Sequence, residues 1–196
     1  MKVSKEQMAE NRQRILETAA RLFREHGFDG IGVADLMQAA GLTHGGFYGH
    51  FKSKEDLMAQ ASGFALARAQ ARWERIAERE KDAPLAVMQR TYLSGKHRDA
   101  PGAGCLLAAL GADAARQNGP VREAVTVGLR AAIELMARLT PGRSKAAKRE
   151  KALAAYASMV GAMVLARAVD DAALSDEILQ ATAASLGLPP SPALAA

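Results

Sequence analysis

VADLMQAAGLTHGGFYGHFKSKEDLM, residues 33–58, carries the most specific folding signals in the chain. Its first part has apolar residues at the i, i+3, i+4, i+7 spacing of a buried helical stripe, which predicts a helix over about 33–40. Gly41 suits the left-handed conformation that ends a helix. Thr43 suits the N-cap of a second helix, predicted over about 44–50.

The second part of this stretch places two aromatic residues four positions apart. Phe47 and Phe51 can therefore both face inward. The polar side chains left to face outward are Thr43, His44, Tyr48 and His50. Ser53, followed three residues later by Asp56, predicts the N-cap of a third helix. Two short helices joined by a tight turn are the outline of a helix-turn-helix DNA reader, although a plain helical hairpin inside a larger bundle has the same outline.

Residues 14–57 resemble the N-terminal DNA-binding domain of the TetR family of bacterial repressors. The matching residues are Ile15, Ala19, Ala20, Leu22, Phe23, Gly27, Val33, Leu36, Ala40, Gly41, Leu42, Gly45, Phe47, Tyr48, His50, Phe51, Lys54, Glu55, Asp56 and Leu57. The resemblance implies an all-α fold with a helix-turn-helix DNA-binding domain over 8–68 and its reading motif at about 31–50. It also implies a helical effector-binding and dimerisation domain over 69–190, and we expect a flexible tail over 188–196.

Composition favours a soluble helical protein. Of 196 residues, 49% are hydrophobic and only 5% aromatic, which is typical of helices packed on small side chains. No apolar run reaches the roughly 18–20 residues needed to cross a bilayer, so we expect no membrane partner. The polar N-terminus lacks the apolar centre of a signal peptide, and the single cysteine fits a reducing compartment. We therefore expect a cytoplasmic protein.

The net charge of +5 is a poor guide to DNA binding once it is located in the sequence. Residues 1–60 hold eight basic and eight acidic side chains, so the helix-turn-helix region is formally neutral. The whole excess lies in residues 61–196. Affinity for DNA must then come from the local placement of side chains such as Lys52 and Lys54, and not from a global field.

Capping residues, prolines and apolar periodicity predict helices throughout the chain and no strand. The expected helices outside the opening stretch run from about Lys5 to His26, 54–81, 84–94, 105–117, 120–139, 145–169 and, with Ser175 as its cap, to near Gly187. Residues 95–104 are expected to form the longest loop.

The resemblance assigns residues 43–50 to the helix that enters the major groove. Arg, Lys, Asn and Gln, which usually read base edges, are absent between Thr43 and Phe51. The family's pattern implies phosphate contacts by Tyr48, His50 and Lys54. The base-reading groups are then Thr43, His44 and the backbone at Gly45 and Gly46, although His44 could equally be an ordinary surface residue.

The predicted helix over 145–169 is rich in small residues. Gly161 in its middle costs about 1 kcal/mol relative to alanine, which indicates a close backbone contact. That contact could lie within one chain, but TetR-family relatives dimerise through their last two long helices. On that resemblance, the expected homodimer interface comprises Leu153, Tyr156, Ala157, Val160, Gly161 and Val164.

The effector is not encoded in a recognisable signature. Side chains that could line an apolar pocket, or else simply fill a core, are Trp73, Met88, Tyr92, Met136 and Met159. Cys105 precedes a helix whose positive dipole end would favour the thiolate, and it follows a loop that contains Lys96, His97 and Arg98. Some TetR-family members sense electrophiles or oxidants through such a cysteine, and an inert buried thiol is the alternative.

Catalysis is not expected. The four histidines lack paired metal-ligand spacing, and there is no phosphate-binding loop or nucleophile elbow, so we expect no enzyme activity, no metal and no cofactor. The expected function is a ligand- or electrophile-responsive repressor that binds a palindromic DNA operator as a homodimer. The alternatives are a non-specific or architectural DNA-binding protein without an effector, and a helical small-molecule carrier that DNA would not retain at low salt.

Overall fold

The computed structural model describes residues 4–117 and 119–189, and within them the chain is helical without strands, which confirms the all-α prediction. The longer helices are α1 (Lys5–His26), α2 (Val33–Ala39), α3 (Lys54–Arg79), α4 (Pro84–Tyr92), α6 (Leu106–Arg116), α7 (Pro120–Leu139), α8 (Lys145–Ala168) and α9 (Ala172–Ser185). The shorter ones are the 3-10 helices η1 (His44–Gly49) and η2 (Pro101–Ala103), and α5 (Gly95–Arg98). Most ends lie within two residues of those predicted.

The N-terminal head consists of α1, α2, η1 and the first half of α3. Its buried core includes Ile15, Phe23, Leu36, Met37, Phe47, Phe51 and Leu57, and residues of α6 and the start of α7 pack against the same core. Ser4 and Ser53 cap α1 and α3 as predicted, because their hydroxyls accept hydrogen bonds from backbone N–H groups three residues later.

The second helix of the helix-turn-helix motif is a 3-10 helix, η1, where the sequence led us to expect a short helix without specifying this type. Gly41 ends the preceding turn with φ of +70°, as predicted. Thr43 occupies the N-cap, but its side chain makes no capping hydrogen bond. Three of the six residues of η1 are glycines, which disfavour a regular α-helix.

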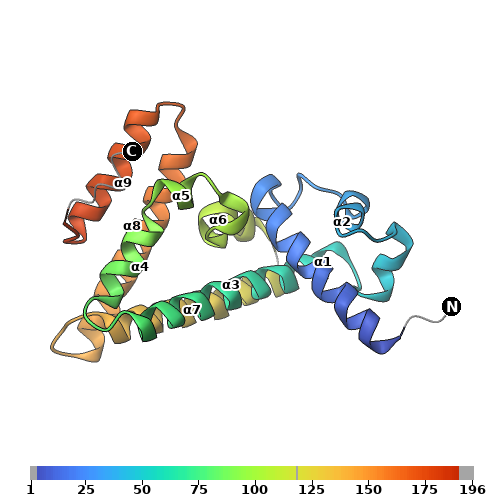
Figure 1. Cartoon of the computed structure of the whole chain (residues 1–196), viewed down its shortest axis with the longest axis horizontal. Helices are drawn as coiled ribbons and strands as arrows, with labels where there is room; N and C mark the ends of the chain where they lie inside the picture. The colour runs from blue at the N-terminus through green and yellow to red at the C-terminus, as the bar shows by residue number, and fades with distance from the viewer. Residues whose placement is uncertain (1–3, 118, 190–196) are drawn as a thin grey trace.

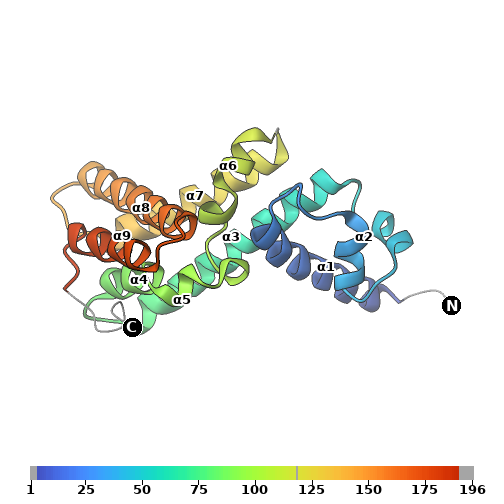
Figure 2. The ribbon, with the colours of Figure 1, turned by 90° about the horizontal axis from the view of Figure 1, so that it is seen from above.

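α3 links the head to the rest of the molecule. This 26-residue helix starts in the head and runs beside α7 (Figures 1 and 2). The two helices approach closely where Gly128 of α7 meets Leu66 of α3, since a Cβ at Gly128 would lie 2.6 Å from Leu66 Cδ1. The missing side chain at residue 128 therefore sets the spacing between them.

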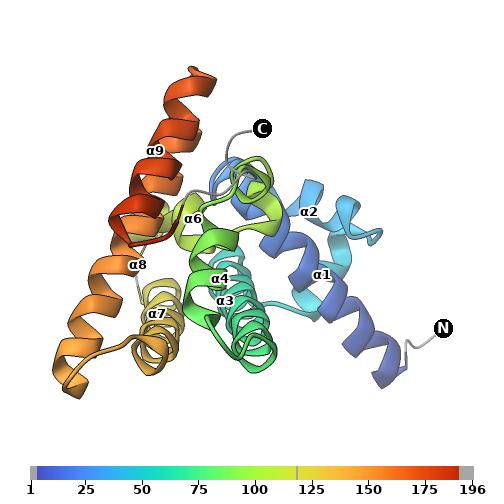
Figure 3. The ribbon, with the colours of Figure 1, turned by 60° about the vertical axis from the view of Figure 1, so that its left-hand side comes forward.

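A second hydrophobic core lies at the other end of α3 and α7. Its members include Tyr92, Leu93, Ile133, Met136, Met159, Met163 and Leu179, from α4, α7, α8 and α9. α8 and α9 pack side by side and form one outer edge of the molecule (Figure 3).

The prediction that Ser175 caps the last helix is wrong. Asp171 is the N-cap, and its Oδ1 accepts hydrogen bonds from the N–H groups of Ala173 and Leu174. Ser175 lies one turn inside α9, where it is 4% exposed and donates to the carbonyl of Ala166 in α8 at 2.6 Å. Its hydroxyl joins two helices.

The prediction that residues 95–104 form the longest loop is also wrong, because this segment contains α5 and η2. Hydrogen bonds from distant helices order it: Arg167 donates to the carbonyls of His97 and Arg98, and Arg24 donates to that of Gly102. The predicted tail lies outside the described residues beyond position 189. Among the described helices, none combines the length and apolar character needed to span a bilayer.

Candidate functional site

η1 and its flanking residues form an exposed surface of the head. Tyr48 is 71% exposed, and Thr43, His44 and Gly45 are exposed beside it. The ring of Tyr48 packs edge-on against buried Phe47, with centroids 5.2 Å apart, so the side chain is supported from below. A Cβ at Gly45 would meet nothing within 4 Å, which leaves the backbone open to a large partner.

The remaining residues predicted to contact DNA, Gly46, His50 and Lys54, are half-buried at the edge of this surface. Burial, and then the neighbouring Arg12 guanidinium, lower the pKa of His50. A neutral His50 can offer a hydrogen bond but little charge. Arg12 lies 4.6 Å from the centroid of the Phe51 ring and donates to the side chain of Gln60.

A cavity of about 510 Å³ lies where α1, α3, residues 91–106 and α8 meet. This volume is within the range of small-molecule sites. Trp73, Tyr92 and Cys105, three of the predicted pocket residues, line it. The other three, Met88, Met136 and Met159, are buried around an adjoining void of about 20 Å³ that shares Trp73 and Tyr92 with the larger cavity.

Two tyrosines stand beside the half-buried thiol of Cys105 in the cavity wall. Burial raises the pKa of Tyr92 and of Tyr156 well above the usual value, and the neighbouring Cys105 raises both further. Both phenols therefore stay protonated and are available as hydrogen-bond donors. Tyr92 is only 3% exposed, and its hydroxyl has the weakly accepting sulfur of Cys105 beside it but no hydrogen bond to a nitrogen or oxygen atom of the described residues.

His97 holds the segment that carries Cys105. Its Nδ1 lies 2.6 Å from the carbonyl oxygen of Tyr92, and its Nε2 accepts a hydrogen bond from the N–H of Cys105 at 2.9 Å. Because the carbonyl can only accept and the N–H can only donate, the proton must be on Nδ1 and the ring must be neutral. Burial lowers the pKa of His97, and the charges of Arg167 and Arg72 add to this effect.

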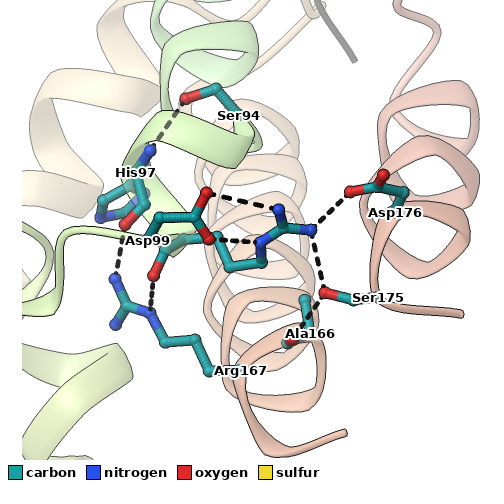
Figure 4. A network of polar contacts seen from close by, with 8 residues as sticks. Ser94, His97, Asp99, Ala166, Arg167, Ser175 and Asp176 are labelled. Atoms are coloured by element: carbon teal, nitrogen blue, oxygen red, sulfur yellow. Dashed lines mark hydrogen bonds and ion pairs between the residues drawn. The ribbon is translucent and has the colours of Figure 1, made fainter. Parts of the chain in front are cut away.

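A polar network ties the same segment to the last two helices (Figure 4). Arg167 of α8 donates to the carbonyls of His97 and Arg98 at 2.7 and 3.0 Å. Arg98 in turn contacts Asp99, and it reaches Ser175 and Asp176 of α9. The cavity wall, α8 and α9 are thus connected by charge-assisted hydrogen bonds, which are stronger than neutral ones.

The residues predicted for a dimer interface divide between two faces of α8. Leu153 is 45% and Val164 42% exposed, and Ala157 and Gly161 are exposed between them. A Cβ at Gly161 would meet nothing within 4 Å in this chain. The other two predicted residues face inward: Tyr156 lines the cavity, and Val160 packs against the second core.

The sequence reasoning missed the arginines of the cavity. Arg68, Arg72 and Arg75 recur at i, i+4 and i+7 on α3, and all three line the cavity with Arg24 of α1. This helical periodicity was available as a signal that they share one face. Arg12 had no comparable signal, since its contacts with Phe51 and Gln60 join residues far apart in the chain.

A helix-turn-helix head joined by a long helix to a helical second domain defines a class of DNA-binding regulatory proteins. Residues 15–61 match the family model described as bacterial regulatory proteins, tetR family. Over these residues the chain is similar to the TetR family.

Curated relatives share the N-terminal part of the chain. It is 40% identical over 57 residues to the HTH-type transcriptional regulator AcrR of Shigella flexneri, covering 29% of this chain and 26% of AcrR. It is 40% identical over 98 residues to the HTH-type transcriptional repressor Rv1474c of Mycobacterium tuberculosis, covering 50% and 44%. It is 36% identical over 96 residues to the repressor AcnR of Corynebacterium diphtheriae, covering 49% and 47%. These matches span less than half of each relative.

Solved structures share the whole fold at low identity. The reduced form of E. coli NemR superposes with a TM-score of 0.77 at 22% identity, covering 94% of this chain and 99% of NemR. A TetR transcriptional regulator from Chloroflexus aurantiacus gives a TM-score of 0.76 at 24% identity, covering 93% and 96%. At these identities the likeness concerns the fold alone.

Proposed function

We propose that the chain is a transcriptional repressor that binds a palindromic operator as a homodimer and releases it when the cavity is occupied. The observation that carries this proposal is the TetR-family match over residues 15–61, the segment that presents Thr43, His44 and Tyr48 on one exposed surface. The relatives named above as repressors support the same direction of control.

Phosphate contacts supply most of the affinity in this proposal. Tyr48 and Lys54 hold the DNA backbone, and neutral His50 adds a hydrogen bond. Thr43, His44 and the open backbone at Gly45–Gly46 approach the base edges. Specificity then depends on few side chains, and the spacing of the two heads contributes much of it.

Dimerisation is proposed through the exposed face of α8 and the adjoining face of α9. Leu165 and Leu174, 57% and 42% exposed, extend the apolar surface formed by Leu153 and Val164. Two copies of α8 and α9 would form a four-helix bundle, in which bare Gly161 allows close approach. Gly161→Leu should shift the equilibrium toward monomer in sedimentation, and an unchanged dimer would place the interface elsewhere. Such a dimer sets its reading elements about 34 Å apart, one turn of DNA.

Release is proposed to act through α1 and α3, because both helices belong to the head and both line the cavity. Arg24 of α1 donates a hydrogen bond to Gly102 in the cavity wall. An occupant that displaces this contact, or that moves α3, changes the separation of the two heads. If the occupant binds more tightly when the heads have this changed separation, its binding lowers the affinity for the operator, and the cavity and the DNA-binding surface are coupled.

A covalent effector is the second form of this proposal, since Cys105 lies in the cavity wall. The thiol would add across the double bond of an electrophile such as N-ethylmaleimide: an S–C bond forms, the C=C π bond breaks, and the thiol proton ends on the adjacent carbon. Cys105→Ser should then abolish DNA release by N-ethylmaleimide. Release that persists in this variant would show that Cys105 is not the sensor.

Variants of the head test the DNA-binding roles. Tyr48→Phe and Lys54→Ala should weaken binding to all sequences, and loss of the Lys54 charge should in addition reduce the salt dependence by a slope of about 1. His44→Ala should chiefly change which sequence is preferred. Fluorescence anisotropy with a selected operator and with random DNA distinguishes the two effects. Equal behaviour of all three variants on both DNAs would refute the assigned roles.

A further inference from the structure

The wall of the 510 Å³ cavity carries an excess of positive charge. Five arginines line it: Arg21, Arg24, Arg68, Arg72 and Arg75. Among the described residues that line the cavity, Glu17 is the one acidic side chain. Glu17 lies 3.6 Å from Arg68, with which it forms an ion pair. His97 is neutral and adds no charge of either sign.

Three of these cations form no ion pair with a carboxylate of the described residues. Arg21 pairs with Glu25 at 2.7 Å. Across residues 4–117 and 119–189, no carboxylate forms an ion pair with Arg24, Arg72 or Arg75. Arg24 is half-buried and donates to the carbonyl of Gly102, whereas Arg72 and Arg75 are exposed at the open side of the cavity. Burial lowers the pKa of Arg24, and the neighbouring Cys105 and Glu25 offset only part of this effect.

The same cavity has an apolar and aromatic side. Trp73 lines it, with the guanidinium of Arg72 5.4 Å from the ring centroid of the indole. The apolar side chains of Phe64 and Leu106 also line the cavity. Deeper in the wall is Tyr92, whose buried hydroxyl stays protonated, lies beside the weakly accepting sulfur of Cys105 and makes no hydrogen bond to a nitrogen or oxygen atom of the described residues. A buried donor of this kind is a binding group for an acceptor atom.

We propose that the cavity binds an aromatic carboxylate. The carboxylate lies against Arg24 and Arg72, the ring packs beside Trp73, and a polar substituent on the ring accepts a hydrogen bond from Tyr92. The identification of this ligand as the effector rests on the proposed function, in which an occupant of the cavity releases the repressor from DNA. The binding site itself follows from the cavity, its unpaired cations and the buried hydroxyl.

Direct binding to the full chain, without DNA, tests the charge preference. The probes are hydrocinnamate and its neutral isostere hydrocinnamamide, compared by isothermal titration calorimetry. Trp73 is the one tryptophan of the sequence, so a change in its fluorescence on titration locates the probe. The carboxylate should bind about tenfold or more tightly than the amide, because hydrogen bonds to charged groups are strong. Equal affinity, or no measurable binding of either probe, would overturn the proposal.

Variants assign the contacts. Arg72→Gln should remove most of the preference for the carboxylate, and the matched control Arg79→Gln, on the same helix outside the cavity, should retain it. Phloretate, which is hydrocinnamate with a para hydroxyl, tests Tyr92: it should bind more tightly than hydrocinnamate to the wild type, and equally tightly to Tyr92→Phe. A preference that persists in Arg72→Gln, or a hydroxyl effect that persists in Tyr92→Phe, would refute the assigned contact.

DNA binding is measured separately, so the two proposals can fail independently. Charge-selective binding that leaves operator affinity unchanged would sustain the aromatic carboxylate site and overturn its role as the effector site. Operator release by a neutral compound, with no preference for hydrocinnamate over its amide, would sustain the repressor and overturn the carboxylate site.

Discussion

Replacing Gly128 with alanine should weaken the contact between α3 and α7. The added Cβ would lie 2.6 Å from Leu66 Cδ1 and 2.7 Å from Leu66 Cβ. Carbon atoms in relaxed contact are about 3.5–4.0 Å apart, so the helices must separate by roughly 1 Å at this point. A different rotamer of Leu66 cannot relieve the contact with its own Cβ, and the residue is only 8% exposed.

Two effects of this substitution oppose each other. Alanine gains about 1 kcal/mol over glycine inside a helix. Forcing an extra methyl group into a packed contact costs about 1–3 kcal/mol. We therefore expect a net loss of about 1 kcal/mol in the free energy of unfolding, which lowers Tm by about 2–4 °C in a chain of this size.

Gly111→Ala in α6 is the matched control, because a Cβ there meets nothing within 4 Å. Only the gain in helix propensity remains, so this variant should be stabilised by about 0.5–1 kcal/mol. Urea denaturation of both variants at equal protein concentration measures the difference. If Gly128→Ala is as stable as Gly111→Ala, the close approach does not set the helix spacing.

Three further results follow from the fold. Asp171→Ala should lose about 1 kcal/mol of stability in urea denaturation, because the N-cap of α9 is removed; an unchanged midpoint would contradict the observed cap. Since burial lowers the pKa of His97, the unfolded chain takes up this proton first as pH falls, so stability should drop below about pH 6.5. Melting curves across that range should show a smaller drop in His97→Gln, and equal drops would refute the assignment. Phe47→Ala should lower the free energy of unfolding by about 3–5 kcal/mol, because it leaves a cavity in the core of the head, and it should abolish DNA binding. Hydrogen-exchange protection of the head that is unchanged in this variant would contradict this prediction.

Local signals in the sequence located most of the helices. Serine caps, proline at the first turn of α7 and the positive φ of Gly41 each depend on neighbouring residues only. The cap of α9 was misassigned because Asp171 and Ser175 are both good capping residues. A contact with Ala166 on another helix decides between them, and it is not visible in local sequence.

The candidate site was harder to predict because it is assembled from distant segments. Residues 95–104 have the composition of a loop, yet hydrogen bonds from Arg24 and Arg167 order them. Arg24 is 78 positions from its partner, and Arg167 is 69 and 70 positions from its two partners. The aromatic residues and Cys105 were identified as pocket candidates by type. The arginines were not, because charged side chains on a long helix usually face solvent. Arg68, Arg72 and Arg75 are indeed exposed, and only the fold places them beside a cavity.

The most direct test of the central claim is a DNA competition measurement with stoichiometry. A palindrome selected from genomic DNA would compete with bulk DNA for the purified chain, and analytical ultracentrifugation would count the chains on each palindrome. We predict two chains per palindrome, with a preference over bulk DNA of about a thousandfold or more. Equal affinity for the palindrome and bulk DNA, or binding as a single chain, would contradict the account.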